Sequence, residues 1–273
     1  MTRTLRPGFD RHVLRPAFAV MFRDGAGGGV VSEDLRVELR EASRIGRPQR
    51  LTANARGVFV AHAVRRMRVP ADDVTSPLLT RRFRLTVTDP RGRFVPLGMD
   101  ADLPTAGLFQ PVCLPTSPSD ADPHVPLFSA AGRTVPAGHA VVRADLRLAS
   151  HPDVGAAWAR LELWLGGGVL AEGVADRHGA ALLHCPLPPL RDPPLRGSPP
   201  HAEPARWPVS LRAYWAPGLA AVDVPDLCAL VQLPEVTLLE QTAPARPLGP
   251  LVLEAGVPLV VRSADSSFLL VGA

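Results

Sequence analysis

Apolar and polar residues alternate in short runs along most of the chain. In Asp34–Arg40, leucine and valine occupy one set of alternate positions, and arginine and glutamate occupy the other. A repeat of two places the sets on opposite faces of a strand, one buried and one solvated. Comparable runs are Val58–Val64, Phe83–Thr88, Arg93–Leu97, Ala140–Leu148, Ala157–Leu165 and Pro208–Trp215, with shorter apolar strands at Leu251–Glu254, Pro258–Arg262 and Phe268–Val271.

Two segments of the second half need closer attention. Every second position of Ala157–Leu165 is alanine or leucine. A repeat of two therefore fits without exception and favours a strand, with a helix as the alternative. The runs Val169–Ala175 and Ala180–Cys185 flank a turn motif and predict a hairpin. The pattern as a whole predicts a mainly β protein.

Proline and glycine divide these runs into two groups. They account for 31 and 23 of the 273 residues, and proline inside a helix removes a donor and clashes, so long helices are not expected. Six prolines fall within 104–126 and nine within 186–208, which predicts long loops there. We predict two tandem antiparallel β-sandwich domains, with an N-terminal lead-in over 1–29, a first sandwich over 30–104, a Pro-rich linker over 105–126 and a second sandwich with C-terminal strands over 127–273.

A turn motif of the form Asx-x-x-Gly occurs three times, each time before a run typical of a strand. Asn or Asp in the first position accepts hydrogen bonds from nearby backbone amides, and glycine in the last position adopts the positive φ that ends the turn. The same order of strand, turn and strand in both halves favours two similar modules. We predict structural turns rather than ligand sites at Asn54 to Gly57, Asp89 to Gly92 and Asp176 to Gly179.

The positive charge of the chain comes from arginine. The chain has thirty arginines, no lysine and 26 acidic residues, which gives a net charge of +4. Spread over this length, that charge is weak evidence for nucleic acid, and aromatic residues, at 5%, supply no stacking set. We expect exposed faces or charge pairing across a protein interface, and no nucleic-acid partner. The densest basic positions are Arg65, Arg66, Arg81 and Arg82.

Motifs for catalysis, phosphate binding or metal binding do not occur in the sequence. The glycine-rich stretch 25–29 lacks the last glycine of GxGxxG, and there is no GxSxG elbow. The eight histidines show no HxH or HExxH spacing, and His184 and Cys185 point to opposite faces of a strand. Glu162 and Asp176 are expected on solvated faces. We therefore expect no catalytic residue, no metal and no cofactor, and a protein that is not an enzyme.

Cysteine usage and the N-terminal region bear on the compartment. The three cysteines, Cys113, Cys185 and Cys228, lie far apart and favour reduced, buried thiols, with one disulfide and a free thiol as the alternative. The apolar run Ala17–Phe22 is shorter than a secretory signal requires, and no run is long enough for a membrane-spanning helix. We expect a soluble, cytoplasmic protein, with release as part of a particle as the alternative.

The aromatic residues offer the other candidates for contact. Trp158 and Trp164 flank one predicted strand. They are either part of the core or a hot spot of a protein interface, where Trp and Arg are enriched. The chain ends in the apolar run Phe268–Ala273, and a terminus of this kind frays unless a sheet or a partner holds it. Phe268 is therefore a further interface candidate.

The layout of strands and turns over Leu35–Leu97 resembles transthyretin-like or carboxypeptidase-regulatory-like β-sandwiches. A wider set of segments is similar to tandem β-sandwich proteins associated with phage-tail-like contractile injection systems. The resemblance implies a structural or assembly role in the baseplate, the tail end or an accessory position, and it carries no catalytic residues. The segments are Arg82–Leu97, Pro126–Ala130, Val135–Ala144, Ala157–Ala159 and Gly173–Gly179.

The function expected from sequence and resemblance is non-enzymatic assembly through protein–protein contacts. The partners are other subunits of a large assembly or further copies of the chain. The alternative is a carbohydrate- or surface-binding β-sandwich module. That alternative predicts an exposed aromatic row, with Trp158 and Trp164 on one open face.

Overall fold

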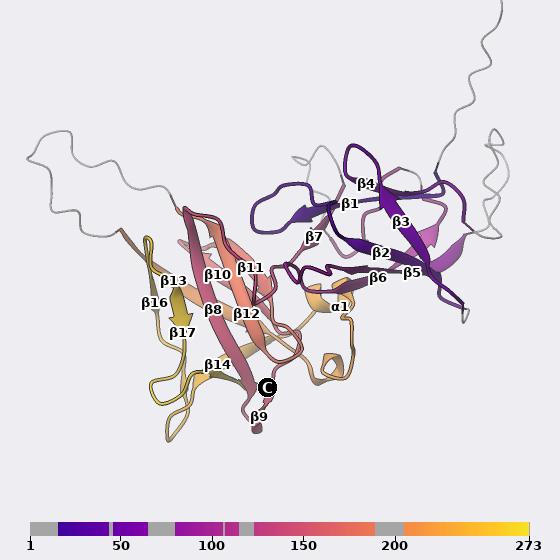
Figure 1. Cartoon of the computed structure of the whole chain (residues 1–273). Coiled ribbons are helices and arrows are strands. Elements are labelled where there is room, and N and C mark those ends of the chain that lie inside the picture. The colour runs from indigo at the N-terminus through magenta and orange to yellow at the C-terminus, as the bar shows by residue number, and fades with distance from the viewer. Residues whose placement is uncertain are drawn as a thin grey trace, which may run out of the picture.

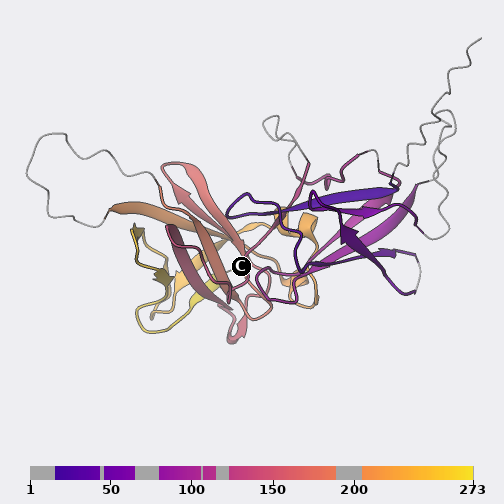
Figure 2. The same cartoon turned by 45° about the horizontal axis from the view of Figure 1, so that its top comes forward.

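A computed structural model describes residues 16–43, 46–64, 80–105, 107–114, 123–188 and 205–272. These residues are mainly β, and they form two curved sheets that lie side by side (Figure 1; Figure 2). The helical elements of the described residues are short: the 3₁₀ turn η1 (Pro217–Leu219) and the helix α1 (Leu227–Val231). Although α1 belongs to the second half of the chain, it lies against the first sheet (Figure 1).

The first sheet has seven strands in the order β6-β5-β2-β3-β4-β1-β7. They are β1 (Phe18–Asp24), β2 (Arg36–Glu41), β3 (Gln49–Ala53), β4 (Val58–Ala61), β5 (Arg81–Thr88), β6 (Leu97–Leu103) and β7 (Val125–Leu127). Neighbouring strands are antiparallel, except that β1 and β7 are parallel. An antiparallel bridge between Phe94 and Ser129 joins the segment before β6 to the segment after β7. The two ends of the sheet therefore meet, which gives it a barrel-like shape.

The second sheet has eleven strands, and its main path is β11-β10-β13-β14-β18-β8-β12. The path comprises β8 (His139–Leu148), β10 (Arg160–Leu165), β11 (Gly168–Val174), β12 (Ala180–Pro186), β13 (Arg206–Tyr214), β14 (Glu235–Glu240) and β18 (Leu269–Gly272). Four short strands pair at its sides: β9 (His151–Gly155), β15 (Arg246–Pro247), β16 (Leu251–Glu254) and β17 (Leu259–Val261). Because β18 lies between β14 and β8, the apolar C-terminal run is an interior strand.

The predicted lead-in and linker both contribute to the first sheet. β1 lies within 1–29 and pairs with β4, and its first five residues are buried. A strand buried on both faces is apolar throughout and does not alternate, which is why a repeat of two does not reveal it. Within 105–126, Phe109 packs its ring 5.3 Å from that of Phe18 and donates its amide to Ala19. The sheet therefore extends beyond the predicted boundaries of 30–104.

Three strand predictions need correction. β10 begins at Arg160, because Trp158 has a φ of 61° and reverses the chain before the strand starts. The expected strand Arg93–Leu97 makes only the bridge of Phe94, and β6 runs onward from Leu97. β11 and β12 do not form a hairpin ladder, since their partners are β10 and β8.

Each sheet encloses its own apolar cluster, but the first cluster also takes residues from the second half. These include Trp158, Val174 and three leucines of the α1 region, Leu227, Leu230 and Leu233. Burying a large apolar side chain removes its surface from water and stabilises the fold by about 1.5–3 kcal/mol. The two halves are therefore joined by a shared apolar contact as well as by the chain itself.

Candidate functional site

The three Asx-x-x-Gly turns share one geometry. The Asn54, Asp89 and Asp176 side chains each accept a hydrogen bond from the amide two residues on and a second from the amide four residues on. The final glycines have φ values of 78°, 67° and 90° at Gly57, Gly92 and Gly179. These side chains are thus committed to their own backbone. The Asn54 turn joins the paired strands β3 and β4, and the Asp89 turn lies in the longer connection between the paired strands β5 and β6. The Asp176 turn joins β11 and β12, which pair with other strands.

The predicted interface residues do not lie together. Trp158 is only 2% exposed and donates its Nε1 hydrogen to the carbonyl of Val222, so it belongs to the core. Trp164 is half-buried on β10. Phe268 is half-buried beneath the Arg147 guanidinium, 4.7 Å from its ring centre.

The basic candidates fall in two places. Arg81 and Arg82 on β5 lie beside acidic residues, Arg81 at 3.7 Å from Glu41 and Arg82 at 3.8 Å from Asp100. Both side chains are exposed by 40% or more, so these contacts are screened by water and contribute little. Arg65 and Arg66 lie outside the described residues.

Five side chains of β10 and β13 form an ordered polar array, in which Arg160 and Glu162 are nearly buried and Arg212 is exposed. We call Arg160, Glu162, Trp164, Arg212 and Tyr214 the Arg/aromatic face. In the ladder, Arg160 is opposite Tyr214 and Glu162 is opposite Arg212. The Arg160 guanidinium lies 4.1 Å from the Tyr214 ring centre, and the Arg212 guanidinium lies 4.1 Å from that of Trp164. Such cation–π contacts hold both the rings and the arginines in place.

Glu162 anchors this face from below. Contrary to the predicted solvated position, its residue is only 7% exposed. Its carboxylate accepts hydrogen bonds from Arg160 at 2.5 Å, Trp164 at 2.9 Å and Tyr214 at 2.8 Å. Burial opposes ionisation, but these three donors outweigh it, so the pKa of the Glu162 carboxyl is lowered. The carboxylate therefore stays charged and fixes three neighbouring side chains.

Two groups have raised pKa values here: Tyr214 within the Arg/aromatic face and Glu172 beside it. Burial and the hydrogen bond to Glu162 raise the pKa of the Tyr214 hydroxyl. Burial, with the nearby Glu162 charge, raises the pKa of the Glu172 carboxyl on β11. Beside Arg212, an open groove of about 460 Å³ lies where β13 and β14 diverge. It is lined by Leu211, Arg212, Glu235, Val236, Thr237, Leu238, Pro247 and Leu248.

A second polar arrangement lies buried where the two halves meet. Arg133 pairs with Asp24 at the end of β1 and donates to the Ser129 hydroxyl at 2.8 Å. Ser129 lies 2.9 Å from Nε2 of His184, whose Nδ1 lies 3.0 Å from Nδ1 of His139. His184 is 2% exposed and Ser129 is 4% exposed. The order of serine, histidine and histidine resembles a nucleophile, a base and its orienting group, but the Ser129 oxygen is enclosed between Arg133 and His184.

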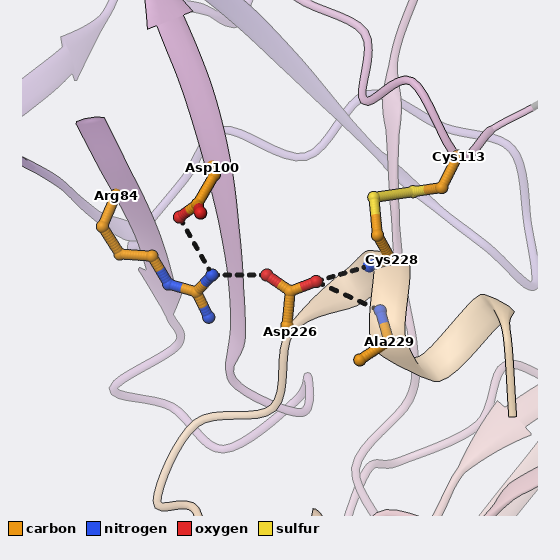
Figure 3. The surroundings of a disulfide bond; sticks show 6 residues. All are labelled: Arg84, Asp100, Cys113, Asp226, Cys228 and Ala229. Atoms are coloured by element: carbon orange, nitrogen blue, oxygen red, sulfur yellow. Dashed lines mark hydrogen bonds and ion pairs between the residues drawn. A yellow bond between two sulfur atoms is a disulfide. The ribbon is translucent and has the colours of Figure 1, made fainter. Parts of the chain in front are cut away.

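The third arrangement attaches α1 to the first sheet (Figure 3). Cys113 and Cys228 form a disulfide, so the expectation of three reduced thiols is wrong, and the alternative of one disulfide and one thiol applies. The remaining thiol, Cys185, is buried, and burial raises its pKa. Asp226 caps α1 by accepting from the amides of Cys228 and Ala229.

Sequence reasoning missed these three arrangements for different reasons. The Arg/aromatic face does leave a trace, because Arg160, Glu162 and Trp164 occupy alternate positions, as do Arg212 and Tyr214. The histidine chain joins residues 45 and 55 positions apart and leaves no local signal. The disulfide partners are 115 residues apart, and with three cysteines the spacing does not select a pair.

Within the described residues, no group of three or more His, Cys, Asp or Glu side chains is placed to hold a metal ion. No helix of the described part is long and apolar enough to cross a membrane.

Comparisons with known proteins give little guidance. No protein-family model matches the chain, and no curated protein matches it significantly. Among solved structures, the Bacillus anthracis TIE protein is similar with a TM-score of 0.26 and 8% identity. The aligned region covers 94% of this chain and 34% of that chain, so this chain spans about a third of its length. At this TM-score the likeness carries no argument about fold or function.

Proposed function

We propose that the chain is a non-enzymatic structural or assembly component of a phage-tail-like contractile injection particle and acts through protein–protein contacts. Its place would be the baseplate, the tail end or an accessory position, and its partners other subunits or further copies of the chain. The resemblance of its turn and strand segments supports the kind of particle. The Arg/aromatic face is the observation that carries the contact role.

The residue types of this face are those that dominate protein interfaces. Tryptophan, tyrosine and arginine are enriched among interface hot spots. Here two guanidinium groups cover two rings, and the Glu162 carboxylate holds three of the side chains from beneath. Because the side chains are already ordered, a partner loses little conformational entropy in binding them. The exposed Arg212 guanidinium makes no ion pair with any described residue, so it is available to a partner's acidic group.

The fold type belongs to the same proposal. We infer two antiparallel β-sandwich units in tandem, Ig-like or transthyretin-like in type, each built on one of the two curved sheets. The separate apolar clusters support this division. The disulfide and the α1 contacts would then make the pair of units a rigid body suited to a particle.

The alternative function, carbohydrate or surface binding, relied on an exposed row formed by Trp158 and Trp164. Trp158 lies in the core instead, so that row is not formed. The observations on the Arg/aromatic face favour a protein partner.

The proposal is tested by sedimentation of lysate from the native host on a density gradient, with the chain followed by mass spectrometry. The wild-type chain should travel with sheath and tube proteins in a very large particle. Arg212→Ala and Trp164→Ala should reduce its share in that fraction about tenfold, in line with the cost of truncating a hot spot. A wild-type chain that sediments at monomer or dimer size would contradict the proposal.

The matched control is Arg206→Ala. Arg206 lies on the same strand as Arg212 and is also exposed, but its guanidinium is paired with Glu254 at 3.0 Å and covers no ring. This variant should remain in the particle fraction. Melting curves of all three variants establish that each is folded, so that a loss from the particle reports a lost contact.

A further inference from the structure

The segment between β7 and β8 is fastened to the outer face of β8 and β12 by a few polar contacts. His184 is opposite Val141 in the ladder, so His139, two residues earlier, is its diagonal neighbour on the same face. Ser129 reaches His184 from above this face. The carbonyl of Ala131 accepts a hydrogen bond from Arg143 at 2.6 Å. Its two ends are also held by the backbone, since the carbonyl of Phe128 accepts from the amide of Val95 and that of Gly138 accepts from the amide of Leu187, and Phe128 is buried in the first apolar cluster. The side-chain contacts therefore hold the middle of the segment.

One arrangement of protons gives every member of this chain a donor or an acceptor to match its neighbour. Arg133 can only donate, so the Ser129 oxygen accepts from it, and the Ser129 hydroxyl hydrogen is free to point at Nε2 of His184. Nε2 is then an acceptor, which places the single proton of the neutral His184 ring on Nδ1. That proton is donated to Nδ1 of His139. In this arrangement both imidazoles are neutral, and every one of the four residues has a hydrogen-bond partner.

The surroundings of His184 favour its neutral form on balance. Burial opposes its charged form, and Arg133 and His139 add to this effect, whereas Asp24 opposes it. Together they lower the pKa of His184 to about 4. The carboxylate of Asp24 is already engaged by Arg133, whose hydrogen bond helps to lower the pKa of that carboxyl.

We propose that the Arg133–Ser129–His184–His139 chain is an acid-sensitive latch, which holds segment 128–138 on β8 and β12 at neutral pH and releases it in acid. A proton taken up at Nε2 of His184 turns that atom from an acceptor into a donor, so the Ser129 hydrogen loses its partner. The new positive charge then lies beside Arg133. This change breaks the hydrogen-bond chain at Ser129, the residue that also makes the Phe94 bridge closing the first sheet.

Amide hydrogen exchange of the intact chain, followed by mass spectrometry at pH 7 and pH 5, tests the latch. After correction for the intrinsic exchange rate, the opening equilibrium of segment 128–138 should rise about 20-fold, given a histidine that titrates near its ordinary pKa when released and near 4 when latched. Amides of β5, which exchange only through a larger opening, should remain much better protected than those of 128–138 at both pH values. Unchanged protection in 128–138, or exchange of 128–138 only together with β5, would overturn the proposal.

Two variants show whether His184 causes the pH dependence of segment 128–138. His184→Gln keeps a polar side chain without a titratable group and should remove the pH dependence of segment 128–138. His151→Gln, at an exposed histidine of β9, should leave it intact. An NMR titration of the His184 ring in the wild-type chain covers the case in which His184→Gln does not fold. A midpoint near the ordinary histidine value, or one that does not coincide with the opening of 128–138, would overturn the proposal.

Discussion

The Asp226 carboxylate joins α1 to β5 by bonding with Arg84 while it caps the helix (Figure 3). The Arg84 guanidinium also donates to Asp100 at 3.2 Å, and it lies flat over Gly98. A Cβ at Gly98 would come within 2.3 Å of the guanidinium. The amide of Gly98 in turn donates to the carbonyl of Pro225 at 2.9 Å. One ion pair, one cap and one backbone bond thus attach the same short segment.

This geometry predicts that Gly98→Ala and Asp226→Ala are coupled. Gly98→Ala should act by displacing Arg84, whose flexible end can move, and Asp226→Ala should cost about 1–2 kcal/mol through the lost cap and ion pair. If both changes break the same contact, the double variant should be less destabilised than the sum of the two by about 0.5–1 kcal/mol. Urea unfolding of the four proteins measures the coupling. Strict additivity would show that Gly98→Ala does not act through the Arg84–Asp226 contact.

The disulfide predicts that the chain is more stable when oxidised. Replacing Cys113 by Ser should lower the free energy of unfolding by about 2–4 kcal/mol, because the cross-link closes a long loop of the unfolded chain. Adding a reductant should destabilise the wild-type chain by a similar amount and leave the Cys113→Ser variant unchanged. Peptide mapping without reduction identifies the pair directly. Equal stability with and without reductant would contradict this account.

Disulfides persist in oxidising compartments and are rare in the cytosol. The Cys113–Cys228 disulfide therefore predicts that the chain is oxidised in material that has left the cytosol as part of a particle. Mapping the pair in protein taken from the native host distinguishes the two compartments. A fully reduced chain in that material would place the protein in the cytosol.

The Gly179 turn predicts a graded cost of adding a side chain. Gly179 has a φ of 90°, and a Cβ there would come within 2.1 Å of the Leu146 carbonyl oxygen. Gly92 has a φ of 67° but nothing within 4 Å of a Cβ. Gly92→Ala should therefore cost about 1 kcal/mol for the backbone alone, whereas Gly179→Ala should cost at least about 2 kcal/mol more. Denaturant unfolding measures the cost of each variant. Equal costs would show that the approach of Gly179 to the Leu146 carbonyl oxygen does not matter for stability.

The parts of the fold that the sequence predicted are those set by local physics. Alternation predicts β5 and β8 because each buries one face, and the Asx-x-x-Gly pattern places the turns because side chain and glycine act within four residues. β1 was missed because it is apolar on both faces. Trp158 was predicted to lie in a strand because an alternating sequence pattern does not reveal a residue with a positive φ. The Cys113–Cys228 pair and the His184 chain depend on long-range packing, which leaves no mark in a single sequence.

The last prediction concerns the pH dependence of global stability. The folded pKa of His184 is about 4 and its unfolded value is near 6.5, so the unfolded chain binds more protons between these limits. Stability is therefore fully present above pH 6.5 and is lost as the pH falls toward 4, by about 3 kcal/mol at most for this one group. The lowered pKa values of Asp24, Asp89 and Glu162 add losses only further down, as these carboxylates become protonated.

Urea unfolding at pH 7, 6, 5 and 4 separates these contributions. The wild-type chain should lose stability steadily over this range, and His184→Gln should flatten the slope between pH 6.5 and pH 5, where the carboxylates remain charged. The two curves should continue to separate as the pH falls toward 4, the folded pKa of His184, because the carboxylates are protonated in both proteins whereas His184 is present only in the wild-type chain. A wild-type curve that is flat above pH 5, or an unchanged slope in His184→Gln, would show that His184 titrates alike in the folded and unfolded chain. Such a result would remove the buried histidine as a determinant of stability.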